Sequence, residues 1–226
     1  MLGDVHTLIS RLGDALDLPW AVCPVTEPSQ TDAINAGAKC QLGRGEQSIF
    51  DSIQSPKRRA EFLAGRLAAK TVLSRPPFSL DQTEIDIVRT PSGAPILLSD
   101  DAISISISHS HGCAVAVASS ETTVGVDLER NEVRPDALVR YFFSDTEKTL
   151  LEALPASQRQ AAVSRLWTRK EAAVKVAGLG GRVPFRSLDC SAEQVTIGDH
   201  LVHLISDSRR DFTLTIAWEK EPSHHG

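Results

Sequence analysis

The sequence predicts an α+β fold made of two similar halves, residues 1–118 and residues 119–226. Each half contains one long helical pattern and several short segments that alternate apolar and polar residues as strands do. The elements follow a similar order in both halves, although no repeat of sequence letters is visible. A chain of 226 residues can bury a sizeable core either as one large domain or as two small ones.

Composition narrows the class of protein. The chain is 41% hydrophobic and 23% charged, as is typical of soluble globular proteins, and its net charge of −5 argues against a general nucleic-acid binder. No apolar run has the length of a membrane span, and the N-terminus carries acids where a signal peptide is basic. Four scattered cysteines favour a reduced setting. We therefore expect a soluble cytoplasmic protein without a nucleic-acid or membrane partner.

The first half is predicted to contain two helices and five strands. The longer helix covers residues 55–75, where Ser55 fits the N-cap, Pro56 the first turn, and Pro76–Pro77 the end. A short amphipathic helix is expected within roughly the first 18 residues, because apolar side chains recur there at helical spacing. The expected strands are 20–25, 84–88, 95–98, 103–108 and 113–118, and the expected loop is 26–48.

The second half is predicted to begin with a strand in "TTVGVDLERNE", residues 122–132. "SDTE", residues 144–147, has the spacing of a capping box and indicates the start of a helix. Pro155 opens a long helix for which Gly178 is a natural stop. Further strands are expected around 187–197, 200–206 and 212–218.

Asp127 and Glu129 stand on the same face of the strand at 122–132, which is otherwise rich in apolar residues. One interpretation is a strand with a single solvated face. The other is a site for a hard cation such as Mg²⁺, which prefers carboxylate oxygens. The pair alone leaves both interpretations open.

The long helix of the second half carries three further candidates. Glu171 and Lys175 lie at the shoulder of its apolar stripe, where they could point into a cleft or form an ordinary exposed i,i+4 pair. Lys170 falls almost within that stripe, so its ammonium group must reach water or find an anion.

Histidines and arginines in the first half could bind an anion or a metal. His109 and His111 end the serine-rich strand, and this spacing fits a zinc site, a histidine beside a phosphate, or structural histidines. Arg59, Arg66 and Lys70 form a basic helix face, which is either simply solvated or a phosphate clamp.

Taken together, three ordered motifs resemble those of the 4′-phosphopantetheinyl transferases of the larger, monomeric type. The motifs are "SISHS", "GVDLE" and "WTRKEAAVK", and "RRAEFLAGRLAAK" and "FFSDTEKTLL" also resemble this family. Such enzymes activate carrier proteins of siderophore and other nonribosomal peptide or polyketide synthases. The resemblance implies a pseudo-twofold α+β fold. Its first half would contact the adenine and 3′-phosphate of coenzyme A, and its second half would hold the metal ligands and the catalytic helix.

The resemblance also implies a reaction. The phosphopantetheine arm of coenzyme A would pass to a serine of an apo acyl, peptidyl or aryl carrier protein, releasing adenosine 3′,5′-bisphosphate. Asp127, Glu129 and Glu171 match the family's ligands for Mg²⁺, with Mn²⁺ as the alternative ion. Glu171 would act as base, directly or through a metal-bound water, and Lys175 would stabilise the phosphate oxygens.

The coenzyme-binding residues implied by the resemblance are Arg59, Arg66, Ala94, Pro95, Ser108, His109, Lys170 and Lys175. There are two departures from the family's pattern. Ala94 stands where many relatives carry Lys or Arg, which leaves its backbone carbonyl to contact adenine, and Leu179 replaces a lysine found in some relatives.

Other functions stay open at this point. A magnesium-dependent phosphotransferase for another substrate, a non-catalytic binder of coenzyme A or of carrier proteins, and a zinc protein are the alternatives. The intact carboxylate set argues against the binder. A carrier protein that is acidic around its serine would fit a basic patch, for which the candidates are Arg165, Arg169, Arg182 and Arg186.

Overall fold

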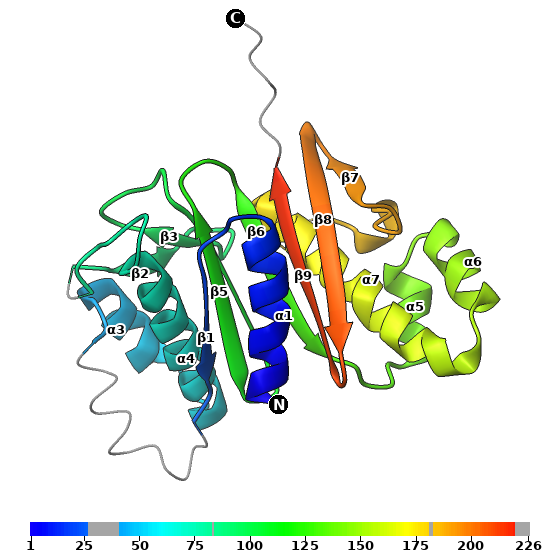
Figure 1. Cartoon of the computed structure of the whole chain (residues 1–226), viewed down its shortest axis with the longest axis horizontal. Helices are drawn as coiled ribbons and strands as arrows, with labels where there is room; N and C mark the ends of the chain where they lie inside the picture. Colours follow the sequence, from blue (N-terminus) through cyan, green and yellow to red (C-terminus); the bar gives the residue numbers. More distant parts are fainter. Residues whose placement is uncertain (27–40, 83, 181–182, 220–226) are drawn as a thin grey trace, which may run out of the picture.

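The computed structural model describes residues 1–26, 41–82, 84–180 and 183–219. Two antiparallel sheets lie beside each other, each with a long helix packed against it, and a two-stranded hairpin stands at one side (Figure 1). The α+β class predicted from the sequence is confirmed. Within the described ranges, no helix combines the length and apolarity that crossing a membrane requires.

The first sheet has the order β1–β5–β4, with long helix α4 packed against it. Alanines and valines of the helix and isoleucines of the strands form its core. The Ser55 hydroxyl accepts from the backbone N–H of Arg58, so the predicted N-cap is confirmed. The elements of this unit are β1 (Trp20–Pro24), α3 (Arg44–Ser52), α4 (Pro56–Leu73), β2 (Ile87–Arg89), β3 (Pro95–Leu97), β4 (Ser104–Ser110) and β5 (Cys113–Ser119).

The second sheet has the order β6–β9–β8–β7 and carries helix α7. The predicted capping box is present, because Ser144 accepts from the Glu147 N–H while Glu147 accepts from the Ser144 N–H. Gly178 follows α7 in a left-handed conformation with φ of 63°, as a helix stop requires. The elements are β6 (Val124–Arg130), α5 (Asp136–Phe142), α6 (Asp145–Ala153), α7 (Ala156–Val176), the short 3₁₀ helix η3 (Phe185–Ser187), β7 (Gln194–Ile197), β8 (His200–Arg209) and β9 (Phe212–Glu219).

Helix α1 (Leu2–Ala15) crosses in front of both sheets (Figure 1). Its buried face enters one apolar cluster with side chains of β5, β6 and β9. At its polar side, Arg11 forms a 2.7 Å ion pair with Asp207 of β8. The predicted amphipathic helix is therefore confirmed, and it links the two halves of the chain. The buried residues of its apolar face include Val5, Leu8, Ile9 and Leu12.

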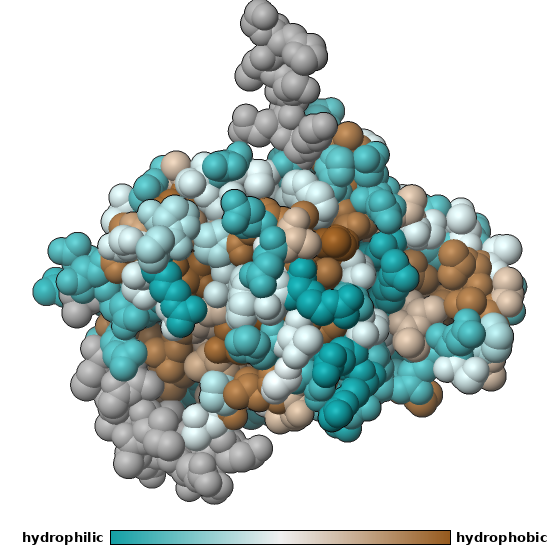
Figure 2. Space-filling model, viewed as in Figure 1, coloured by the Kyte–Doolittle hydropathy of each residue, from teal (hydrophilic) through white to brown (hydrophobic). Residues whose placement is uncertain are grey.

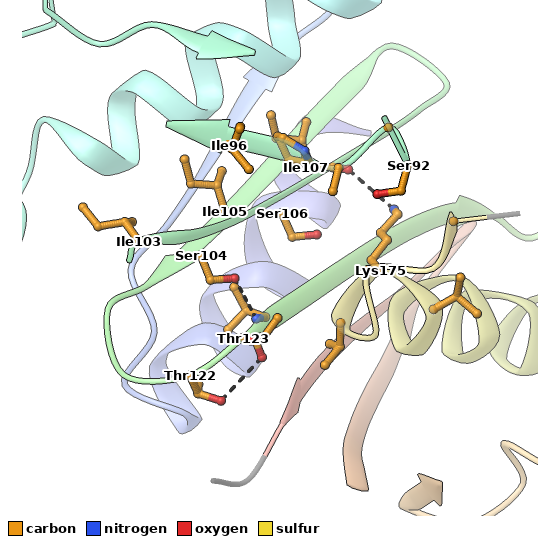
Figure 3. Close-up of a pocket in the computed structure, with 18 of the residues that line it drawn as sticks. Ser92, Ile96, Ile103, Ser104, Ile105, Ser106, Ile107, Thr122, Thr123 and Lys175 are labelled. Atoms are coloured by element: carbon orange, nitrogen blue, oxygen red, sulfur yellow. Dashed lines mark hydrogen bonds between the residues drawn. The ribbon is translucent and has the colours of Figure 1, made fainter. Parts of the chain in front are cut away.

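Serine side chains join the two sheets where β4 and β6 run side by side. Alternate serines of β4 each accept a hydrogen bond from a backbone N–H of β6, over distances of 2.9 to 3.3 Å. The bond of the first serine is drawn in Figure 3. We call these four serines the serine ladder. Its pairs are Ser104 with Val124, Ser106 with Val126, Ser108 with Leu128, and Ser110 with Arg130.

The same buried ion pair occurs once in each half. Glu46 pairs with Lys70 at 3.0 Å, and Glu147 pairs with Lys170 at 2.8 Å. Both glutamates sit in the first turn of a short helix and accept from the N–H at its N-cap. Both lysines also donate to backbone carbonyls further along the chain. This repeat of position and bonding supports the similarity of the halves predicted from element order.

Two elements differ from the sequence prediction. The expected loop at 26–48 is wrong from Arg44 onward, where α3 begins, while residues 27–40 lie outside the described residues. The start of α3 is stabilised from a distance, because Asp86 accepts from the N–H groups of Gly45 and Glu46. A cap supplied about 40 residues downstream leaves no local signal.

Helix α5 is the second element that the sequence analysis missed. In addition, β7 begins at Gln194 rather than near 187, because η3 ends at Ser187 and residues 188–193 form no helix or strand. Neither α5 nor η3 buries a residue, so neither shows the apolar periodicity on which helix prediction depends.

Candidate active site

The site forms where β4, β6 and α7 meet between the two sheets. Gly125 of β6 lets α7 approach closely, because a Cβ there would lie 2.2 Å from the Ala172 carbonyl oxygen. This approach brings the carboxylates of β6 next to Glu171 and Lys175 of α7. A cavity of about 600 Å³ opens there, lined by residues of β4, α7 and the β2–β3 turn (Figure 3).

Asp127 is the buried centre of the site. Its Oδ1 accepts from Lys175 Nζ at 2.8 Å and from Ser108 Oγ at 3.0 Å. Its Oδ2 is buried and makes no hydrogen bond. A buried carboxylate oxygen without a partner is costly, so this oxygen marks a place for a positively charged ligand.

Lys175 reaches from α7 to both halves. Its ammonium group donates to the carbonyls of Val126 at 2.7 Å and Ile107 at 3.5 Å in addition to Asp127. Figure 3 shows the side chain extended along the cavity toward Ser92 and Ile107. The lysine therefore holds a positive charge at the line where the two sheets adjoin.

Glu129 and Glu171 complete the carboxylate set. Burial raises the pKa of Glu129, and Asp127 raises it further, while Arg134 opposes both effects through a 2.9 Å ion pair. Burial likewise raises the pKa of Glu171, followed by the charge of Asp127, and Lys175 opposes them. The carboxylates therefore lie close enough to repel one another, and negative charge is in excess.

This excess, with the unpartnered oxygen of Asp127, fits an oxygen-ligated divalent cation. In the described part of the chain, no three His, Cys, Asp or Glu side chains already stand in the arrangement of a formed metal site. The ammonium of Lys175 supplies the nearest positive charge to Asp127.

A second cavity, of about 670 Å³, is basic and adjoins the first at Gly93, Pro95 and Ile107. Arg66 stands in its wall: the side chain is buried, lies 3.4 Å from Glu46 and stacks on Phe62. Burial lowers the pKa of Arg66 to about 10, and its Nη2 has no hydrogen-bond partner. The charged or titratable side chains that line the cavity are Arg58, Arg66, Arg89, His109 and one carboxylate, Glu61.

His109 projects into this basic cavity with 46% of its side chain exposed. Burial lowers the pKa of His109, and Glu61, 4.0 Å away, acts in the opposite direction. His111 instead pairs with Glu132 at 2.9 Å at the turn that follows β4. The two histidines thus have separate partners, which removes the reason to join them in a zinc site.

The turn between β2 and β3 brings Gly93 and Pro95 to the border of both cavities, and Ala94 lines the first cavity alone. The Ala94 carbonyl accepts from the Thr90 N–H at 2.9 Å, which uses one of its two lone pairs. Gly180 approaches this turn from the other half, since a Cβ on it would lie 2.7 Å from the Ser92 carbonyl oxygen.

Four sequence expectations need correction. Lys170 is fully buried against Glu147 and the Phe185 and Leu188 carbonyls, so it cannot contact a coenzyme. Arg59 bonds to the Ile53 carbonyl and is not among the residues lining the basic cavity.

The other two corrections concern Ser108 and the basic patch. The Ser108 hydroxyl is buried between Asp127 and Leu128 rather than open to a phosphate. Arg169 is also buried, with its guanidinium bonded to Ser206 and to three backbone carbonyls. Arg182 lies outside the described residues, so the expected patch is not assembled by them.

Sequence reasoning missed three arginines of the site. Arg58 lies in the basic start of helix α4, but the sequence analysis predicted its neighbour Arg59 as the coenzyme-binding residue. Arg89 ends a three-residue strand, and Arg134 lies in the segment before α5, where it pairs with Glu129 and lies 5.7 Å from the Trp167 ring centre. Neither position carries a periodic signal.

Comparison with known proteins identifies the family of this chain. Residues 123–218 match the model of the 4′-phosphopantetheinyl transferase superfamily, and residues 47–119 match that of the 4′-phosphopantetheinyl transferase N-terminal domain. The 4′-phosphopantetheinyl transferase HetI of Nostoc sp. is 30% identical over 181 residues, which cover 76% of this chain and 72% of HetI. The putative 4′-phosphopantetheinyl transferase slr0495 of Synechocystis sp. is 29% identical over 163 residues, covering 70% of this chain and only 64% of that protein.

Among solved structures, a holo-(acyl-carrier-protein) synthase from Bacillus anthracis in complex with CoA overlaps 44% of this chain and 96% of its own. Its TM-score is 0.39 and its sequence identity 19%. The holo-[acyl-carrier-protein] synthase of Thermotoga maritima has a TM-score of 0.35 and 17% identity, covering 44% of this chain and 63% of its own.

Proposed function

Because the chain belongs to the 4′-phosphopantetheinyl transferase superfamily, we propose that it transfers the phosphopantetheine arm of coenzyme A to a serine of an apo carrier protein. Adenosine 3′,5′-bisphosphate is the second product, and Mg²⁺ or Mn²⁺ is required. The observation that carries the proposal is the convergence of Asp127, Glu129, Glu171 and Lys175 beside a basic cavity.

Coenzyme A is proposed to lie across the two adjoining cavities. The 3′-phosphate occupies the basic cavity, where Arg58, Arg66 and Arg89 provide guanidinium groups and His109 a ring nitrogen. Adenine lies against Ala94, which lines the first cavity, and Pro95, which lines both. The pyrophosphate then reaches Lys175, whose ammonium stabilises its oxygens.

The carboxylates are proposed to hold the cation. Asp127 contributes its unpartnered Oδ2, and Glu129 and Glu171 contribute the neighbouring oxygens. The bound cation would offset negative charge on the pyrophosphate of coenzyme A. Arg134 orients Glu129 through their ion pair.

Glu171 is proposed as the general base. Its raised pKa brings the carboxylate closer to the value at which it can accept a proton near neutral pH. The carrier serine oxygen forms a bond to the phosphorus that bears pantetheine, and the bond from that phosphorus to the bridging oxygen breaks. The serine proton passes to Glu171, directly or through one water, and adenosine 3′,5′-bisphosphate leaves with the electron pair.

The carrier protein is proposed to approach from the aromatic side of Glu171. A cavity of about 570 Å³ there is lined by Tyr141, Phe142, Trp167 and Phe185 together with Glu171. Tyr141 is 68% exposed and Phe142 43% exposed, which leaves apolar surface for a partner. Figure 2 shows a further apolar area at the edge of the molecule where α6 lies. Arg186, one of the arginines expected to form a basic patch, also lines this cavity.

The test is the intact mass of apo carrier proteins after incubation with the full chain, coenzyme A and Mg²⁺. Fatty-acid, polyketide and peptide carriers are each tried. A gain of one phosphopantetheine unit is expected with the wild type and with Glu152→Gln, an exposed change on α6, but not with Glu171→Gln. Coenzyme A binding without transfer to any carrier would contradict the proposed function.

A further inference from the structure

Ser108 has a bond that the other members of the serine ladder lack. All four serines accept from a backbone N–H of β6. Ser108 also donates its own proton to Asp127 Oδ1, at 3.0 Å. Its hydroxyl therefore accepts one hydrogen bond and donates another, and both partners, the Leu128 N–H and the Asp127 carboxylate, belong to β6.

These bonds fix the orientation of Asp127 from two sides. Ser108 holds Oδ1 from β4 in the first half, and Lys175 holds the same oxygen from α7 in the second half, at 2.8 Å. Asp127 is buried, and its other oxygen, Oδ2, has no partner. With Oδ1 occupied twice, the direction of Oδ2 is determined.

The position of Ser108 next to His109 connects its bond to Asp127 with the basic cavity. Ser108 directly precedes His109, which lines the basic cavity, so one short stretch of β4 borders both the anion-binding surface and the carboxylates. A shift of β4 relative to β6 would move His109 and release Asp127 together, because the ladder is the link between these strands.

We propose that Ser108 is a positioning residue that orients Asp127 across the β4–β6 boundary, so that the free Oδ2 faces the divalent cation. The inference rests on the proposed function, since it assigns a task to Ser108 in the same site. It differs from the expectation that Ser108 contacts a coenzyme phosphate, because the hydroxyl is already committed to Asp127 and to the Leu128 N–H.

Ser106 provides a matched control. It is buried on the same strand and accepts from the Val126 N–H at 2.9 Å, but its hydroxyl makes no bond to a carboxylate of the described residues. Ser106→Ala and Ser108→Ala thus each remove one ladder bond, and only the second also releases Asp127. Ser108→Thr keeps a hydroxyl at the position and serves as the rescue variant.

The measurement is calorimetric titration of coenzyme A into the full chain, with and without Mg²⁺. Loss of a group that orients a metal ligand typically weakens metal affinity by about 10- to 100-fold. We therefore expect Ser108→Ala to reduce the Mg²⁺-dependent gain in coenzyme A affinity by about tenfold. Ser106→Ala should keep that gain and Ser108→Thr should restore it. Because Ser106 also lines the first cavity, each variant is judged by the ratio of its affinities with and without Mg²⁺. Affinity without Mg²⁺ should be unchanged in the two Ser108 variants.

Each other outcome overturns the inference. If Ser108→Ala and Ser106→Ala had equal effects, Ser108 would act only through its bond to the backbone of β6 and not through Asp127. A loss of coenzyme A affinity without Mg²⁺ would mean that Ser108 contacts the coenzyme. If the wild type itself showed no Mg²⁺-dependent binding, the metal part of the proposed function would fail first and this inference with it.

A second pair of substitutions separates the loss of the hydroxyl donor from a loss of packing. Ser108→Cys and Ser106→Cys keep the approximate size of the side chain but replace a strong donor with a weak one. The same contrast between the two positions is expected for the cysteine variants, and its absence in folded protein would count against the proposal.

Discussion

Gly125 determines how closely helix α7 approaches strand β6. A Cβ at this position would lie 2.2 Å from the Ala172 carbonyl oxygen and 3.1 Å from a methyl carbon of Val176. Because the first contact is with backbone, rotation of a side chain cannot relieve it. The geometry of Asp127 and Lys175 therefore depends on the absence of a side chain two residues before Asp127.

We predict that Gly125→Ala lowers the free energy of unfolding by about 3 kcal/mol, since overpacking against a rigid neighbour forces α7 away from β6. Urea denaturation measures the change. Gly3→Ala is the control: Gly3 is exposed on α1 and no heavy atom lies within 4 Å of its added Cβ, so stability should stay equal or rise by up to about 1 kcal/mol. Equal stability of Gly125→Ala and wild type would contradict the close approach.

Lys170 illustrates how one residue can belong to the fold rather than to the site. We predict that Lys170→Ala lowers the free energy of unfolding by about 3 to 5 kcal/mol, because Glu147 would stay buried without a partner. Thermal and urea denaturation measure this decrease in the free energy of unfolding. The control is Lys148→Ala, which removes an ion pair with the exposed Asp145 and should cost less than about 1 kcal/mol.

If Lys170 instead acted on the coenzyme, its loss would weaken coenzyme A binding in protein that is still folded. Calorimetry at a temperature below the unfolding transition separates these two results. We expect unchanged affinity.

At the scale of elements, local capping chemistry explains which helices could be predicted. Ser144 and Glu147 bond to each other's backbone within four residues, so the start of α6 is readable from sequence. Helix α3 is different: Glu46 bonds locally to the Gly43 N–H, but its N-cap residue is a glycine without a side chain, and the N–H groups of Gly45 and Glu46 bond to Asp86, far away in the chain. Pattern reasoning detects the first kind of cap and cannot detect the second.

The candidate site also contains residues with a local sequence signal and residues brought in only by distant parts of the chain. Asp127 and Glu129 were singled out because two carboxylates on one strand face are unusual, and the resemblance to a family predicted them, together with Glu171, as metal ligands. Arg89 and Arg134 join the site only through tertiary packing. Lys170 was misassigned because a lysine in an apolar stripe points equally to a ligand and to a buried glutamate.

We predict that Ser144→Ala destabilises the protein by about 1 kcal/mol, through loss of the N-cap bond to the Glu147 N–H. The same change frees Glu147 to shift, so the Lys170 pair should weaken with it. Thr149→Ala is the control on the same helix, since Thr149 is exposed and bonds only to a preceding carbonyl oxygen. Chemical denaturation that ranks Thr149→Ala as the more damaging change would refute the cap.

At the scale of the whole molecule, the two proposed halves share a core. The repeated Glu–Lys pair and the helix-on-sheet arrangement support our proposal that residues 1–118 and 119–226 are related halves. Helix α1 belongs to the first half but packs on β8 and β9 of the second as well as on β1 and β5. The halves should therefore unfold together rather than one after the other.

Leu8 of α1 is fully buried in the cluster that joins β5 to β6 and β9. We predict that Leu8→Ala lowers the free energy of unfolding by about 3 kcal/mol, as cavity-forming substitutions do, while a single transition is retained. Far-UV circular dichroism reports both halves, and the tryptophans that pack against this cluster, Trp20 and Trp218, report its surroundings. The two signals should change at the same urea concentration.

Leu150→Ala is the control for this experiment, because Leu150 is 41% exposed on α6 and its loss should cost much less. Two separated transitions in either variant or in the wild type would show that the halves are independent. A shared transition has a functional consequence: coenzyme A that bridges the halves would raise the midpoint of both signals equally, since a ligand bound only to the native state stabilises everything that unfolds with its site.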